Sequence, residues 1–93
     1  MKHDFFSLKN KVAIVTGGNQ GIGKVVAGYL ADAGADVVIF DLNDASEVAE
    51  KIAEEYGVRT AAFVCNVTDP GDVEKNIQAA AEKMGTLDLR PHN

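Results

Sequence analysis

The chain has 93 residues, 46% of them hydrophobic, which suits one small domain with a modest core. Its 9 basic and 14 acidic residues give a formal net charge of -5, and the basic residues are scattered, which argues against binding to nucleic acid or to an anionic membrane. No apolar run is long enough for a signal peptide or a membrane span, so the sequence predicts a cytoplasmic protein.

The first part of the chain is predicted to form a strand, a helix and a second strand. Residues 11–15 are predicted to form a strand; after Lys11 they make a continuous apolar run, typical of a strand buried on both faces. The helix that follows is expected to end before Gly34, and residues 37–40 form a second strand that closes on Asp41. We expect one apolar stripe of this helix to face the core. Its members are Ile22, Val25, Val26, Tyr29, Leu30 and Ala33.

A second helix and a third strand continue the alternation. The segment from Asp44 to Glu47 resembles a capping box with Asp44 as the N-cap. The apolar stripe of residues 48–56 then predicts a helix that ends at Gly57. Residues 60–65 form the third predicted strand.

A third helix is marked at both of its ends. Asp69 is the expected N-cap, Pro70 fits the first helical position, and Gly85 follows the last apolar residue. Residues 86–89 begin a fourth strand. The single cysteine, Cys65, closes the third strand and is expected to be a small buried hydrophobe, since one cysteine cannot form an internal disulfide.

Four strands alternating with three helices predict an α/β fold with a parallel sheet and right-handed crossovers. We expect a three-layer, Rossmann-type arrangement with strand order 3-2-1-4, in which ligands bind at the switch point between the first and fourth strands. The first two helices should cover one face of the sheet and the third helix the other. Residues 1–93 form one domain in this interpretation, truncated after the fourth strand.

A glycine-rich loop joins the first strand to the first helix. Glycines there permit a tight turn, a close approach of the backbone to a pyrophosphate and close packing of helix on strand. The N-terminus of the helix offers free N–H groups and partial positive charge to the phosphates. The spacing is weak evidence by itself, and the glycines could serve only a turn; the strand–loop–helix context favours a dinucleotide site. Its candidate residues are Thr16, Gly17, Asn19, Gln20, Gly21, Ile22 and Gly23.

An acidic residue at the end of the second strand adds a second part to this site. Asp41 lies 20 residues after Gly21, where a carboxylate can accept hydrogen bonds from the ribose hydroxyls and repel a 2′-phosphate. The next two residues, Leu42 and Asn43, bring no positive charge, so the sequence predicts NAD rather than NADP as the cofactor. Alternatively, Asp41 could help only to cap the next helix.

The loop and its surroundings resemble those of the short-chain dehydrogenase/reductase family. The family pattern Thr-Gly-x-x-x-Gly-x-Gly is matched by Thr16, Gly17, Gly21 and Gly23, and the resemblance extends over residues 8–89. It implies an NAD(P)-dependent oxidoreductase that transfers hydride between a small alcohol and a carbonyl compound. It also implies adenine contacts after the third strand, where Asn66 and Val67 stand in place of the family's common Asp-Val. Asn66 could instead be a simple turn residue.

The family's catalytic Tyr-x-x-x-Lys pair has no match in this sequence. Tyr29 is followed four positions later by Ala33, and Tyr56 by Thr60. Both tyrosines fit apolar helical stripes and are expected in the core. No catalytic residue and no metal ligand can be assigned, so we expect the chain to carry the cofactor-binding portion of the enzyme and to be inactive alone.

The end of the chain departs from the family pattern. The fourth strand should continue through apolar residues, but Arg90 and Pro91 follow Leu89. A shortened fourth strand would leave apolar surface and an open sheet edge, so we expect weak stability or self-association. A nucleotide-binding or interaction module without catalytic activity remains the alternative to a truncated dehydrogenase.

Overall fold

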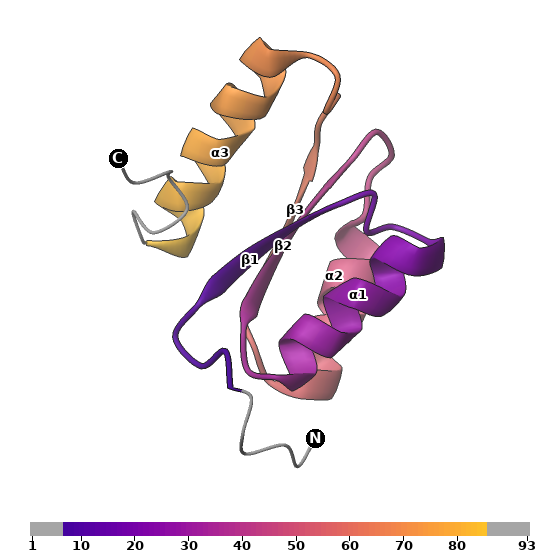
Figure 1. The fold of residues 1–93 in the computed structure, drawn as a ribbon, viewed down its shortest axis with the longest axis vertical. Helices are drawn as coiled ribbons and strands as arrows, with labels where there is room; N and C mark the ends of the chain where they lie inside the picture. Colours follow the sequence, from indigo (N-terminus) through magenta and orange to yellow (C-terminus); the bar gives the residue numbers. More distant parts are fainter. Residues whose placement is uncertain (1–6, 86–93) are drawn as a thin grey trace.

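The computed structural model describes residues 7–85 and confirms the alternation of strands and helices over that range (Figure 1). The fourth predicted strand, at residues 86–89, and the chain beyond it lie outside the described residues. In chain order the elements are β1 (Val12–Thr16), α1 (Gly21–Asp32), β2 (Asp36–Asp41), α2 (Ser46–Tyr56), β3 (Thr60–Val64) and α3 (Pro70–Met84).

The three strands form a parallel sheet in the order β1-β2-β3. The register places Thr16 beside Phe40 and Asp41 beside Val64, so the carboxyl ends of the strands lie at one edge of the sheet. This arrangement agrees with the 3-2-1 portion of the predicted order; the predicted place of a fourth strand lies outside the described residues.

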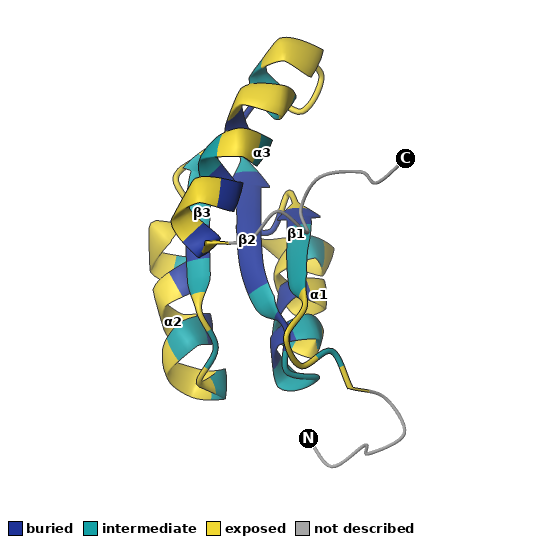
Figure 2. Ribbon diagram, turned by 90° about the vertical axis from the view of Figure 1, so that its left-hand side faces the viewer, coloured by how far each residue is buried: buried dark blue, intermediate teal, exposed yellow. Residues whose placement is uncertain are grey.

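Helices α1 and α2 cover one face of the sheet and α3 lies on the opposite face, as predicted (Figure 1). The central strand β2 is buried along most of its length (Figure 2). Its side chains alternate between two apolar clusters: Val37 and Ile39 pack with α1 and α2, whereas Val38 and Phe40 pack with α3. Each fully buried side chain of this size stabilises the fold by about 1.5–3 kcal/mol relative to exposure.

The cluster under α3 also contains an aromatic pair and the cysteine. The rings of Phe40 and Phe63 meet edge to face at a centroid distance of 6.1 Å. Cys65 is only 1% exposed, which confirms the expected buried hydrophobe. Burial raises the pKa of the Cys65 thiol, and the negative charge of Asp72 raises it further.

The two predicted N-caps have different outcomes. Asp69 caps α3 as expected, accepting hydrogen bonds from the backbone N–H groups of Gly71 (3.0 Å) and Asp72 (3.4 Å). The capping box at α2 is wrong: the N-cap is Ala45, and no side chain caps the first turn. The carboxylate of Asp44 instead accepts the backbone N–H of Ser46 at 2.9 Å and its hydroxyl, which holds the turn before the helix and lowers the pKa of Asp44.

The predicted orientation of α1 is largely wrong. Ile22 and Tyr29 are 82% and 66% exposed, and Val25 and Val26 are exposed as well. The residues of α1 that are buried are Ala27 and Ala31, whose short side chains lie against the sheet. Because small residues also make an apolar face, α1 is apolar on two sides, and the face with the larger side chains is turned away from the sheet.

The remaining members of the expected stripe and the other tyrosine are intermediate in exposure. Leu30 packs partly against the α1–α2 cluster and Ala33 is half-buried at the helix end. Tyr56 is half-buried against the same cluster, in line with its expected packing, whereas the expectation that Tyr29 is a core residue is wrong. Between residues 7 and 85, no helix is long and apolar enough to cross a membrane.

Candidate functional site

The predicted site residues come together at the carboxyl edge of the sheet. Hydrogen bonds between backbone atoms connect the loops that follow the three strands. The N–H of Gly17 donates to the carbonyl of Phe40 at 2.8 Å, and the N–H of Cys65 donates to the carbonyl of Asp41 at 2.8 Å. The loop after β1, the end of β2 and the loop after β3 therefore lie together at the carboxyl edge of the sheet (Figure 1).

The glycine-rich loop follows a path that side chains would obstruct. Gly17 and Gly21 have φ values of +68° and +63°, in the left-handed region that favours glycine. A Cβ on Gly23 would collide with the carbonyl group of Gly17. The loop and the start of α1 therefore pack closely enough that position 23 accommodates no side chain.

Gly18 is a requirement of this loop that the sequence analysis missed. It is buried, and a Cβ there would lie 2.9 Å from Cγ2 of Ile39 on β2. The adjacent pair of glycines after Thr16 was the available signal, but only the packing on Ile39 shows why the second of them is needed.

The first turn of α1 has no side-chain cap. Its N-cap residue, Gln20, has an extended backbone and makes no side-chain hydrogen bond to the helix, and no acidic residue lies in the first turn. The exposed start of the helix includes Gly21 and Ile22. The N–H groups of a first turn have no partner within the helix, so this end is suited to binding an anion.

Asp41 connects the glycine-rich loop to the end of β2. Its Oδ2 accepts the backbone N–H of Asn19 at 3.2 Å, and its Oδ1 accepts that of Asn43 at 2.9 Å. An ionised carboxylate has about four acceptor positions, so these two bonds leave capacity for two hydroxyl donors. The neighbouring Leu42 has an exposed side chain. The structure thus places a fixed carboxylate directly beside the glycine-rich loop.

Four hydrogen bonds hold Asn66, which lies in the loop after β3; in one of them its backbone carbonyl accepts the N–H of Asp69 at 3.1 Å. Its Oδ1 accepts the backbone N–H of Thr68 at 3.0 Å and the Thr68 hydroxyl at 2.7 Å. Its own backbone N–H donates to Oδ2 of Asp72 at 2.7 Å. Asn66 is therefore a turn residue whose side chain is also exposed at the edge of the sheet, next to the exposed Val67.

Thr68 and Asp72 are also residues that the sequence analysis did not select. The Asn-x-Thr spacing is compatible with an Asx turn and could have identified Thr68. The contact from Asp72 spans six residues and depends on where the first turn of α3 lies relative to β3, so no local pattern predicts it.

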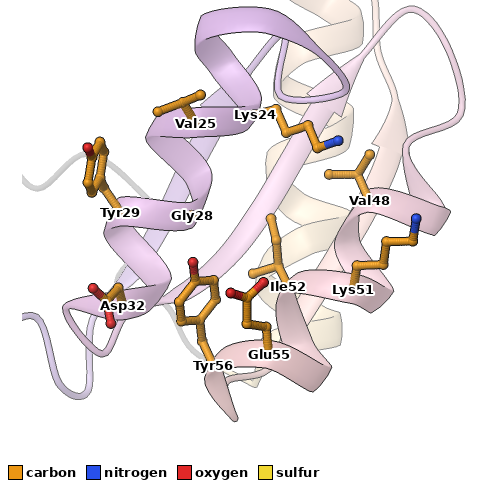
Figure 3. A pocket seen from close by; sticks show the side chains of 10 residues that line it. All are labelled: Lys24, Val25, Gly28, Tyr29, Asp32, Val48, Lys51, Ile52, Glu55 and Tyr56. Carbon is orange, nitrogen blue, oxygen red and sulfur yellow. The ribbon is translucent and has the colours of Figure 1, made fainter. Parts of the chain in front are cut away.

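A groove of about 650 Å³ lies elsewhere, between α1 and α2 (Figure 3). It contains none of the predicted cofactor residues. Its lining brings two lysines and two acidic residues together with aromatic and aliphatic side chains. Partial burial raises the pKa of Tyr56, and the neighbouring Glu55 carboxylate adds to that effect. The lining residues are Lys24, Val25, Gly28, Tyr29, Asp32, Val48, Lys51, Ile52, Glu55 and Tyr56.

Comparison with known proteins gives one family. The model of the short chain dehydrogenase family matches residues 11–93. A sorbose reductase from Candida albicans is 51% identical over 87 residues, which cover 92% of this chain and 31% of that protein. A probable NADP-dependent mannitol dehydrogenase from Yarrowia lipolytica is 45% identical over 85 residues, covering 90% of this chain and 31% of that one.

Solved structures show the same relationship. An NADPH-dependent 3-quinuclidinone reductase from Rhodotorula rubra superposes with a TM-score of 0.80 at 34% identity, covering 86% of this chain and 31% of that one. A putative D-mannonate oxidoreductase from Haemophilus influenza with bound NAD has a TM-score of 0.80 at 27% identity, covering 88% of this chain and 30% of that one. The chain spans about a third of the length of these proteins.

Proposed function

The chain belongs to the short chain dehydrogenase family, and we propose that the loops at the carboxyl edge of its sheet bind the adenosine diphosphate part of a nicotinamide dinucleotide. The observation that carries this proposal is the hydrogen bond from the N–H of Asn19 to Asp41. It puts the uncapped start of α1, which can bind a pyrophosphate, next to a carboxylate that can bind ribose hydroxyls.

The complete protein, in this proposal, is an oxidoreductase that transfers hydride between an alcohol and a carbonyl compound. Relatives named as a sorbose reductase and a mannitol dehydrogenase support this activity and make ketoses and sugar alcohols the first substrates to test. The chain itself contributes cofactor binding rather than catalysis. Neither Tyr29 nor Tyr56 is followed four positions later by the lysine that would lower the pKa of a catalytic tyrosine.

NAD is the proposed cofactor, although the names of two relatives describe them as NADP- or NADPH-dependent and a third structure contains NAD. The support is Asp41, whose carboxylate is held beside the glycine-rich loop by two backbone N–H groups. A negative charge there would repel the 2′-phosphate of NADP, and the adjacent Leu42 and Asn43 carry no charge to offset it.

A calorimetric titration of the 93-residue chain with NAD and with NADP tests both statements. We expect Asp41→Ala to weaken NAD binding by roughly tenfold or more, because hydrogen bonds to a charged group are worth about 1.5–3 kcal/mol. NADP binding should be weakened far less or improved. Asn43→Ala is the matched control, since it keeps the backbone N–H that contacts Asp41.

Two outcomes would contradict the proposal at different points. Equal weakening of NAD and NADP by Asp41→Ala would remove this carboxylate from the ribose site. If the folded wild-type chain binds neither dinucleotide, the proposed function of these loops is wrong.

A second candidate is a nucleotide-binding module without catalytic activity. The test is to express a full-length coding sequence. If the encoded protein oxidises an alcohol or reduces a ketone, the second candidate is excluded. Tight NAD binding without turnover of any such substrate would support the second candidate.

A further inference from the structure

The groove between α1 and α2 carries opposite charges at its two ends (Figure 3). Lys24, near the start of α1, and Lys51, in the middle of α2, hold their amino groups at one end. The carboxylates of Asp32 and Glu55, in the last turns of the same two helices, lie toward the other end. Both helices follow strands of one parallel sheet and run in the same direction, so the charges of the groove are sorted along one axis.

The two lysines of the groove are not neutralised by the fold. Lys24 and Lys51 are exposed, and neither forms an ion pair with any residue between 7 and 85. Two ammonium groups at one end of a groove repel each other and attract negative charge from outside. Because the same groove has carboxylates at its other end, its charge pattern is complementary to a copy of itself turned end for end.

Apolar side chains line the groove between its charged ends. Val25 and Tyr29, on α1, are 57% and 66% exposed, whereas Ile52, on α2, is buried. Large exposed apolar side chains gathered on one face are typical of a surface that contacts another protein. Burial of this surface would supply the driving force for docking, and the charges would set the orientation of the partner.

At Gly28 the α1 wall of the groove has no side chain. A Cβ there would meet only the hydroxyl of Tyr56 at 3.7 Å and its Cε2 at 4.0 Å, which are ordinary contacts, so the fold has room for an alanine. Glycine in the middle of a helix is destabilising relative to alanine. The packing of the chain therefore does not account for this glycine, whereas the close approach of a second backbone would. Gly28 stands midway between Lys24 and Asp32 along α1.

We propose that a second copy of this chain docks on the groove in the antiparallel direction, about a two-fold axis that crosses both helices near Gly28. Lys24 then faces the second copy's Asp32. Lys51 faces the second copy's Glu55. A two-fold interface repeats every contact, so each of these pairs occurs twice. Gly28 lets the two α1 helices approach closely where they cross the axis.

This mode of association differs from pairing through the sheet. Within residues 7–85, β1 has a neighbouring strand on one side only, and its other side could pair with a strand of another copy. Pairing of that kind depends on backbone hydrogen bonds and is indifferent to charges on α2. The proposal is also independent of dinucleotide binding, because none of the proposed cofactor residues lines the groove.

Sedimentation equilibrium of the 93-residue chain tests the proposal by exchanging charges on α2. We expect wild type to be in equilibrium between monomer and dimer. Lys51→Glu and Glu55→Lys should each raise the dimer dissociation constant by about tenfold or more, because each replaces two attractive contacts by two repulsive ones. The two variants change the net charge in opposite directions, so a general charge effect would not weaken both.

An equimolar mixture of Lys51→Glu and Glu55→Lys should restore association. In the mixed dimer the two substituted side chains face each other as one pair of opposite charges, and the native Lys51 and Glu55 form the other pair. We expect a dissociation constant within about threefold of the wild-type value. Glu54→Lys is the matched control, since Glu54 is exposed on the same helix but does not line the groove, and it should change association by less than about threefold.

Gly28→Leu is a second variant that leaves all charges in place. Its side chain would fill the groove at the axis and should weaken association by about tenfold or more. Gly28→Ala, with its smaller side chain, should weaken association less than Gly28→Leu does. Thermal melts followed by circular dichroism confirm that each variant is folded.

Three results would overturn the proposal. One is a wild-type chain that stays monomeric up to roughly 1 mM. Another is wild-type association that Lys51→Glu and Glu55→Lys leave unchanged, which would place the contact on another surface such as the open side of β1. The third is a mixture of the two variants that associates no better than either variant alone. Calorimetry with NAD on the same samples tests the proposed function separately.

Discussion

Helices α1 and α3 both begin just beyond the carboxyl end of a strand, yet their first turns are completed differently. In α3 the Asp69 carboxylate accepts two of the free N–H groups. In α1 the N-cap Gln20 accepts none, and the first turn contains no acidic residue. A helix start with its own carboxylate is electrostatically complete, whereas one without a cap favours an anion from outside. The comparison indicates which helix start is structural and which is free for a ligand.

The two helix starts should differ most in how the free energy of unfolding responds when a glycine in the first turn is replaced by alanine. The glycines are Gly23 in α1 and Gly71 in α3. Gly23→Ala would drive a Cβ into the carbonyl of Gly17, whereas a Cβ on Gly71 meets only Oδ1 of Asp69 at 3.5 Å. We expect Gly23→Ala to lower the free energy of unfolding by about 1–3 kcal/mol and to remove dinucleotide binding. Gly71→Ala should be neutral or stabilising by up to about 1 kcal/mol. Urea denaturation measures the free energy of unfolding of both variants. Equal losses of stability in Gly23→Ala and Gly71→Ala would contradict the closer packing at Gly23.

The comparison can be inverted by giving α1 a cap of the type that α3 has. Gln20→Asp should stabilise the helix by about 1 kcal/mol but weaken NAD binding at least tenfold, because the carboxylate occupies the N–H groups and repels the pyrophosphate. Gln20→Asn provides the control, since it can cap without a charge and should weaken binding less. Thermal melts and calorimetry on the same samples separate the two effects. Unchanged NAD affinity in Gln20→Asp would show that the phosphates bind elsewhere.

The reverse change removes the cap of α3. Asp69→Ala should cost about 1 kcal/mol of unfolding free energy, since two N–H groups lose their acceptor. Asp69→Ser should restore most of this loss. We expect Asp69→Ala to change the NAD dissociation constant less than Gln20→Asp does. A loss of binding as large as that in Gln20→Asp would mean that α3 also takes part in cofactor binding.

The smallest effect on stability is expected on the outer face of α1. Ile22 and Tyr29 are exposed, so Ile22→Ser with Tyr29→Ser should change the free energy of unfolding by no more than about 1 kcal/mol in total. These residues do offer apolar surface for the predicted self-association. Sedimentation velocity at several concentrations should show less association in the double variant than in wild type. A wild-type chain that stays monomeric at every concentration would contradict that prediction.

Over residues 7–85 the sequence predicted the order of elements correctly, because most boundaries have a local chemical cause. The Asp69-Pro70 pair marks the start of α3, and Gly57 and Gly85 adopt left-handed backbone conformations after α2 and α3. The N-cap at α2 was predicted wrongly because Asp44 has a nearer partner: its carboxylate binds Ser46, so Ala45 is the N-cap and the helix begins at Ser46. Local patterns therefore predict that a helix starts, but competing short-range hydrogen bonds decide the residue at which it starts.

The burial of α1 could not be predicted from periodicity. A helical stripe shows which side chains share a face, but not which face meets the sheet, and in α1 the faces of Ala27 and of Val25 are both apolar. The sheet selects the alanines because small side chains permit close approach to β1 and β2. The site shows the same limit: Asp41 was predicted from its place after a strand, whereas the contact between Asp72 and Asn66 depends on tertiary geometry.

The buried thiol of Cys65 also provides a native reporter of local opening. It lies within the cluster that joins α3 to the sheet, and it is the single cysteine of the chain. An alkylating reagent can reach it only when α3 separates from β3, since burial both shields the sulfur and keeps it protonated. Its rate of modification therefore measures how often the α3 side of the sheet opens, independently of α1 and α2 on the opposite face.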